Sequence, residues 1–94
     1  MDVVELKAHG SGLRLVPGAG GAVARYWRER APTRDWLRPA SAEALSRGDR
    51  YEAAAFPLVP FSNRIRGGRF RFDGRDVSLP LNRPPERHAI HGQA

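Results

Sequence analysis

The polar residues of this chain best suited to bind an oxygen-rich ligand are Asn63, Arg64 and His91. A guanidinium donates two parallel hydrogen bonds from one rigid fork, and a carboxamide both donates and accepts. Strands and turns can bring residues that are distant in sequence side by side, so one ligand could contact all three. Taken alone, Arg64 is also compatible with a structural ion pair and Asn63 with a turn-forming amide. For His91 taken alone, a structural hydrogen bond is the better account.

Asn63 and Arg64 lie in the segment FPLVPFSNRIRGGRFRF at positions 56–72, with prolines before them and glycines after them. Its two prolines fix φ and remove backbone donors, so the stretch before Ser62 is expected to be extended and irregular. The Gly67-Gly68 pair permits a sharp reversal before a strand begins. Asn63 and Arg64 should therefore lie in a rigid, non-helical setting.

A β-hairpin is the clearest local prediction, because Asp73-Gly74 is typical of a two-residue type I′ turn and is flanked by alternating residues. The expected register pairs Arg69 with Ser78, Phe70 with Val77, Arg71 with Asp76, and Phe72 with Arg75. This register brings apolar side chains together on one face and opposite charges together on the other. A slip of one residue would destroy both matches.

The rest of the chain is predicted to be mostly strand. Alternation and turn residues favour strands over residues 3–8, 13–16, 22–28 and 35–38. Ser41 to Arg47 is the one convincing helical segment, with Ser41 as its cap and Gly48 as its end. It would be one or two turns long, and an irregular loop fits these residues equally well. The side chains expected to be buried between two packed sheets are Phe70, Phe72, Val77, Leu79, Leu13, Leu15 and Trp27.

Two short motifs in this order carry a resemblance to a known family: PFSNRIRGGRF, and NRPPERHAIHG after the hairpin. They resemble the N-terminal part of the aldose 1-epimerase (galactose mutarotase) family. The matching positions are Pro60, Asn63, Arg64, Ile65, Gly68, Phe70, Asn82, His91 and Gly92. The resemblance implies an all-β, antiparallel β-sandwich of the galactose-mutarotase type, with residues 1–94 as the N-terminal part of a single, truncated domain. The family motif continues with a second glycine where this chain has Gln93.

The resemblance also implies a function: interconversion of the α and β anomers of free aldohexoses such as galactose or glucose. In the family the positions of Asn63, Arg64 and His91 line the hexose pocket. The acid histidine and base glutamate lie in later segments, and no position of this chain matches them, so no catalytic residue is expected here and the 94 residues alone should be inactive. No metal or other cofactor is implied, and the partner is a monosaccharide. The preferred sugar and the oligomeric state stay open.

Composition narrows the setting further. The chain has no cysteine, which excludes disulfides and thiolate metal sites and favours a reducing compartment. It has no apolar run long enough for a membrane span, and its beginning lacks the features of a signal peptide, so the cytoplasm is expected. The net charge is +6, but the basic residues are scattered along the chain and interleaved with acidic ones, which favours a solvated surface over a nucleic-acid partner.

Other functions remain as competitors. A non-catalytic carbohydrate-binding protein on the same scaffold is the main one. Arg66-Gly67-Gly68-Arg69-Phe70 resembles an arginine-glycine RNA-binding box, although it occurs once and runs into the hairpin. A metal site of His9, His88 and His91 would lack a completing carboxylate or cysteine. The glycines between residues 18 and 21 lack the spacing of a phosphate-binding loop and indicate a turn.

Overall fold

A computed structural model describes residues 2–92 of the chain, which divides into two compact units. The first unit ends at Pro57 and the second begins at Leu58. The extended lead-in predicted before Ser62 is confirmed, since residues 56–62 form no helix and take part in a sheet only through an isolated bridge at Val59.

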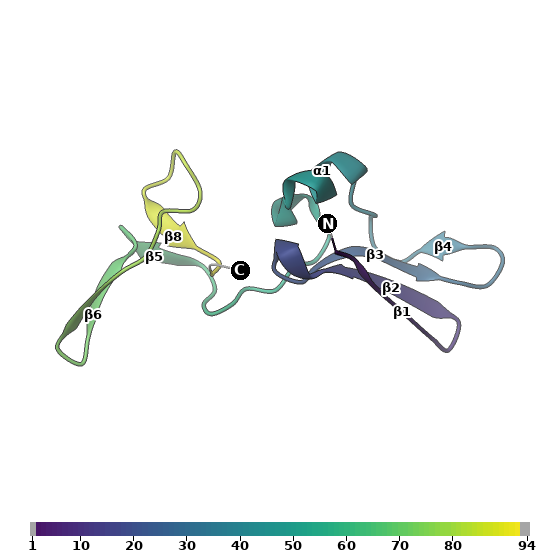
Figure 1. Cartoon of the computed structure of the whole chain (residues 1–94), viewed down its shortest axis with the longest axis horizontal. Helices are drawn as coiled ribbons and strands as arrows, with labels where there is room; N and C mark the ends of the chain where they lie inside the picture. The colour runs from purple at the N-terminus through teal and green to yellow at the C-terminus, as the bar shows by residue number, and fades with distance from the viewer. Residues whose placement is uncertain (1, 93–94) are drawn as a thin grey trace. The chain divides into compact units, whose positions relative to one another are not determined.

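The first unit is built on a four-stranded antiparallel sheet in the order β1-β2-β3-β4 (Figure 1). The strands are β1 (Val4–Ala8), β2 (Ser11–Val16), β3 (Ala22–Arg28) and β4 (Arg34–Asp35). β2 starts two residues earlier than predicted, because Ser11 already pairs with Ala8 across a two-residue turn. β4 stops short of the predicted Arg38, because the N–H groups of Trp36 and Leu37 both donate to the Tyr26 carbonyl and leave the ladder.

A β-bulge interrupts the pairing of β2 with β3. Arg14 pairs with Arg25 and Leu15 with Val23, which leaves Ala24 as an extra residue on β3. A bulge changes which residues face each side of a strand. The simple alternation expected along residues 22–28 is therefore wrong, and Ala22 and Trp27 are both buried.

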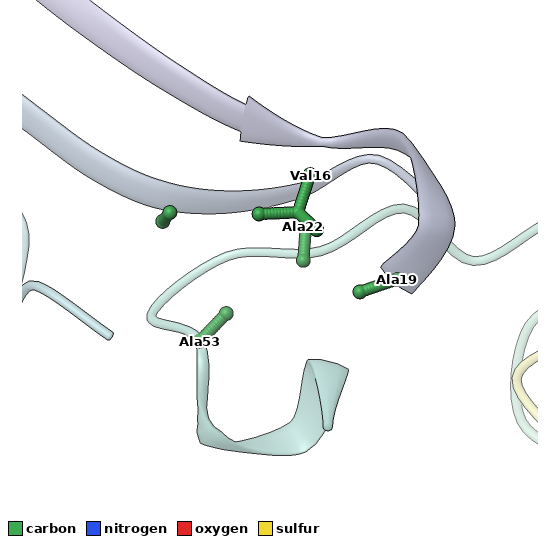
Figure 2. Close-up of a cluster of buried hydrophobic side chains, with 5 residues drawn as sticks. Val16, Ala19, Ala22 and Ala53 are labelled. Atoms are coloured by element: carbon green, nitrogen blue, oxygen red, sulfur yellow. The ribbon is translucent and has the colours of Figure 1, made fainter. Parts of the chain in front are cut away.

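The core of the first unit is small and consists largely of alanine. Figure 2 shows Val16, Ala19, Ala22 and Ala53 converging where the end of the β2–β3 hairpin meets the loop that follows the helical segment. Ala24 completes the cluster, and the half-buried Leu45 and Phe56 pack against it. Side chains this small let backbone segments approach closely, so the packing depends on backbone position more than on large side chains.

The short helix is confirmed as α1 (Ala42–Arg47). Ser41 Oγ accepts a hydrogen bond from the Ala44 N–H at 3.1 Å, and Gly48 ends the helix with a φ of 66°. Two 3-10 turns were not predicted, η1 (Pro17–Ala19) and η2 (Arg50–Glu52). A capping signal for η2 is present in the sequence, because Asp49 Oδ1 accepts from the Tyr51 N–H at 3.1 Å.

The second unit holds two antiparallel strand pairs (Figure 1). They are β5 (Arg64–Arg66) with β8 (His88–Ile90), and β6 (Arg69–Phe72) with β7 (Arg75–Ser78). The β6–β7 register is the predicted one at all four pairs, and Arg71 Nη1 lies 3.5 Å from Asp76 Oδ1 across it. The Gly67-Gly68 turn between β5 and β6 is also confirmed, with φ of 61° and 67°. The fold class is thus mostly antiparallel β, as expected.

The predicted set of buried side chains is largely wrong. Phe70 is 44% exposed and Phe72 73% exposed, because β6 and β7 form a sheet of two strands only, and the apolar face they share remains open to solvent. Four more members of the set are only half-buried: Leu13, Leu15, Val77 and Leu79. Trp27 alone is buried, because its ring lies over Gly12, where a Cβ would collide with it.

No helix within residues 2–92 is long and apolar enough to cross a membrane.

Candidate functional site

The structure brings Asn63 and His91 together at adjoining ends of β5 and β8. The Asn63 N–H donates to His91 Nδ1 at 2.9 Å, and the His91 N–H donates to the Asn63 carbonyl at 3.0 Å. The next pair along the ladder joins Arg64 to Ile90. All three residues singled out in the sequence therefore lie at one end of a single strand pair.

Both residues of this reciprocal pair have left-handed backbone conformations. Asn63 has a φ of 61° and His91 a φ of 57°. This region is unfavourable for residues with a Cβ, although asparagine and histidine enter it more readily than most, and such outliers gather at functional sites. The Asn63 side chain offsets part of this cost, because its Oδ1 accepts from the Arg64 N–H at 2.8 Å. Asn63 is thus a turn-forming amide, and its Nδ2 has no partner within residues 2–92.

Arg64 is held by an ion pair with Glu86. Arg64 Nε donates to Glu86 Oε1 at 2.6 Å, and the two side chains are 49% and 35% exposed. This hydrogen bond raises the pKa of Arg64 and is the main cause that lowers the pKa of Glu86. No hydrogen bond from the terminal Nη groups of Arg64 is found within the part of the chain that the structure describes. The anchor therefore fixes the stem of the guanidinium and leaves its terminal donors available.

Asn82 fixes the backbone on both sides of His91. Its Nδ2 donates to the carbonyls of Ile90 and Gly92, each at 2.8 Å, and its Oδ1 accepts from the Ile90 N–H at 2.8 Å. A carboxamide that satisfies three backbone groups at once restrains the chain more than a single bond would. Asn82 thus restrains the backbone on either side of His91.

Gly92 allows the lead-in segment to approach His91. Val59 and Gly92 form an isolated parallel bridge, and a Cβ built on Gly92 would overlap the Val59 carbonyl oxygen. Gly92 also has a φ of 79°. The glycine is therefore required by both its conformation and the close backbone approach. Gln93, where the family motif has a second glycine, lies outside the described residues.

Comparison with known proteins identifies the family. The sequence profile described as aldose 1-epimerase matches residues 2–94. The chain belongs to the aldose 1-epimerase family. The uncharacterized Escherichia coli K12 protein YphB is 36% identical over 85 residues, covering 90% of this chain and 27% of YphB. A second uncharacterized protein of that organism, YihR, is 43% identical over 35 residues, covering 37% of this chain and 11% of YihR.

A solved structure shows the same fold in this family. The crystal structure of a "Putative aldose 1-epimerase" from Escherichia coli K12 matches with a TM-score of 0.74 and 32% identity, covering 97% of this chain and 28% of the other. The chain thus spans about a quarter of the length of YphB and of this solved relative. The antiparallel β architecture is that of a portion of an aldose 1-epimerase fold.

In this aldose 1-epimerase family member, the site presents a set of hydrogen-bond donors. Because His91 Nδ1 accepts the Asn63 N–H, the neutral imidazole carries its proton on Nε2. Asn63 Nδ2 and the Arg64 Nη groups are donors as well. This arrangement suits a ligand with several hydroxyl oxygens, whereas no cluster of three or more His, Cys, Asp or Glu side chains that could hold a metal ion is found within residues 2–92.

Sequence reasoning missed Glu86. It lies in the proline-rich loop, 22 residues from Arg64, and no local spacing indicates that the two would meet. The sequence offered only a general reason to expect a partner for Arg64, since a partly exposed arginine at a strand end often pairs with a carboxylate. His88, considered as a metal ligand, instead accepts the Gly67 N–H through Nδ1 at 3.1 Å, which ties it to the β5–β6 turn.

The Arg64–Glu86 pair should titrate in acid. Because Arg64 lowers the pKa of Glu86 in the folded protein, the pair stabilises the fold above the unfolded-state pKa of glutamate. That contribution is lost as the pH falls through the lowered folded-state pKa. A carbon-13 NMR titration of the Glu86 carboxyl should give a midpoint below the ordinary glutamate value, and Arg64→Ala should move it upward. An unchanged midpoint in Arg64→Ala would show that the pair does not persist in solution.

Proposed function

We propose that the protein is an aldose 1-epimerase that interconverts the α and β anomers of free aldohexoses such as galactose and glucose, and that Asn63, Arg64 and His91 bind the sugar. The observation that carries this proposal is the reciprocal hydrogen bonding of Asn63 with His91 beside an anchored Arg64. Family membership supports the reaction class. The geometry supports the assignment of these three residues to the ligand.

The reaction needs two proton transfers and no redox change. A general acid protonates the ring oxygen while a general base removes the proton from the anomeric hydroxyl, so the bond between the anomeric carbon and the ring oxygen breaks. The open-chain aldehyde rotates about its terminal carbon–carbon bond. Reclosure with the two proton transfers reversed gives the other anomer, and both groups return to their starting protonation states.

The residues of this chain would act by binding and orientation. A hexose hydroxyl accepts hydrogen bonds readily, and the donors of Asn63 Nδ2 and Arg64 Nη provide them from one strand pair, next to the His91 ring. Two-pronged donation from Arg64 would fix two neighbouring hydroxyls at once. The general acid and base are expected from segments of the family that have no match in these 94 residues.

Polarimetry tests the proposed reaction. The gene product that contains these residues should speed the optical-rotation change of freshly dissolved α-galactose and α-glucose, in proportion to its concentration. A rate that stays at the buffer value while galactose still binds would replace the proposal with a non-catalytic carbohydrate-binding protein. Retention of RNA in place of sugar would instead favour the arginine-glycine segment as the functional element.

A further inference from the structure

The first unit carries a basic depression that takes no part in the proposed sugar site. Its volume is about 290 Å³, and it is lined by His9, Gly10, Ser11, Arg28, Arg30 and Trp36. These residues come from the β1–β2 turn, from the start of β2, from the end of β3 and from the segments on either side of β4. All of them belong to the first unit, whereas Asn63, Arg64 and His91 belong to the second.

The two arginines that line this basic depression have no acidic partner. Neither Arg28 nor Arg30 forms an ion pair within residues 2–92. The nearest carboxylates in sequence are engaged elsewhere: Glu29 Oε1 lies 2.9 Å from Lys7 Nζ, and Asp35 Oδ1 lies 2.7 Å from Arg25 Nε. The positive charge of the depression is therefore not neutralised by the described chain.

Strand pairing adds to this excess of charge. Arg28 lies directly opposite Arg34 on β4 and opposite Ser11 on its other side, on β2. Like charges placed opposite each other across an antiparallel pair destabilise the sheet. Arg34 forms no ion pair with the described residues either. A bound anion would offset this repulsion, and the Ser11 hydroxyl would supply a neutral donor beside it.

Arg30 lies close to Gly10 in the β1–β2 turn. A Cβ at Gly10 would lie only 2.9 Å from Arg30 Nε, so the glycine lets the guanidinium lie close to the turn. The Glu29 N–H donates to the Gly10 carbonyl at 2.8 Å and ties the two segments together. Arg30 thus follows a backbone segment that is tied to the Gly10 turn.

Trp36 gives the depression a flat, apolar wall. Its side chain is 47% exposed although it is large and hydrophobic, while its N–H is held by the Tyr26 carbonyl at 2.8 Å. An indole face beside guanidinium groups suits a ligand with an anionic end and a compact body. The volume lies near the lower limit of ordinary small-molecule sites, which fits one small metabolite better than a polymer.

We propose that this basic depression binds the phosphate monoester of a small metabolite, with Arg28 and Arg30 as the phosphate-binding residues and Trp36 packing against the rest of the ligand. A phosphate has three terminal oxygens and two negative charges near neutral pH, so it can take a two-pronged contact from each guanidinium. This site is additional to the proposed sugar site and does not depend on it.

The test follows the indole N–H resonance of Trp36 in the NMR spectrum of the gene product that contains these residues. Inorganic phosphate and glucose 6-phosphate are the probes, and glucose is the uncharged control. Both phosphates should shift the resonance saturably, with glucose 6-phosphate binding more tightly because its sugar reaches Trp36. Arg28→Gln and Arg30→Gln should each weaken binding at least about tenfold, the usual loss when a charge-assisted hydrogen bond is removed.

Arg38→Gln is the matched control, because Arg38 also lacks an ion pair within residues 2–92 but does not line the depression. It removes the same charge and should leave binding unchanged within about twofold. Equal weakening by Arg38→Gln, a shift with glucose alone, or no saturation by either phosphate would each overturn the proposal.

Thermal melting of every variant checks folding. Arg30→Lys keeps the positive charge but loses the planar, two-pronged guanidinium, so it should bind phosphate with intermediate affinity. Mutarotation measured without phosphate should be unaffected in Arg30→Gln, so failure of one proposal leaves the other standing.

Discussion

Replacing Arg64 with alanine in the gene product that contains these residues is expected to lower kcat/KM for the proposed anomer interconversion by between about tenfold and 150-fold. Arg64 keeps its Nη donors clear of the described chain while Glu86 holds Nε at 2.6 Å. A hydrogen bond from a charged donor contributes about 1.5–3 kcal/mol, and each 1.4 kcal/mol is about a factor of ten. Polarimetry at several galactose concentrations gives kcat/KM directly.

Arg66 provides the control for that substitution. It lies two residues further along β5, so its side chain leaves the same face of the strand, and it forms no ion pair within residues 2–92. Arg66→Ala removes an equal charge and should change kcat/KM by less than about twofold. Equal losses from Arg64→Ala and Arg66→Ala would show that net charge, and not the anchored guanidinium, matters. Glu86→Gln should fall between them, mainly through KM.

Replacing Gly92 with alanine is expected to destabilise the protein by about 2–5 kcal/mol, the sum of a left-handed backbone penalty and of overpacking against a rigid neighbour. The added methyl group would overlap the Val59 carbonyl oxygen, and Gly92 has a φ of 79°. Backbone atoms cannot move aside as the end of a flexible side chain can. Urea denaturation measures the loss, and hydrogen exchange at the His91 N–H locates it.

Gly74 provides a control that separates the left-handed backbone penalty from the overpacking. It has a φ of 71° at the hairpin turn, but a Cβ there would meet nothing within 4 Å. Gly74→Ala should therefore cost only the conformational penalty, about 1–2 kcal/mol. If the two substitutions destabilise the protein equally, the close approach of Val59 to Gly92 does not exist in solution. The exchange rate of the His91 N–H should rise in Gly92→Ala and stay unchanged in Gly74→Ala.

The hairpin shows what the sequence alone could predict. Asp73-Gly74 defines the turn, and the residues on both sides alternate in a way that only one register satisfies, so local chemistry determines all four pairs. The helix after Ser41 was predictable for the same reason, since its cap and its terminating glycine lie within one short stretch of sequence.

The site needed more than local signals. Asn63 and His91 are 28 residues apart, and their meeting depends on β5 pairing with β8, which no short pattern predicts. The family resemblance supplied that juxtaposition. The role of Glu86 was not predicted, because its ion pair with Arg64 spans a proline-rich loop and produces no periodic pattern in the sequence.

The burial predictions failed for a different reason. Alternation shows that Phe70 and Phe72 share a face, but it does not show whether a second layer covers that face. The extra residue Ala24 on β3 was likewise invisible, because a bulge is a property of two paired strands and not of one. The residues of one strand or hairpin determine which side chains share a face, whereas burial depends on segments that are distant in sequence.

The most direct test of the central claim is chemical-shift mapping of the gene product during titration with galactose. The N–H resonances of Asn63, Arg64 and His91 should shift together and saturate at one dissociation constant, while those of Asp73 and Gly74 at the hairpin turn stay unchanged. In Arg64→Ala the same sugar concentrations should produce little shift. Galactose-induced shifts that spare these three residues and appear elsewhere would contradict the assignment of this strand pair to sugar binding.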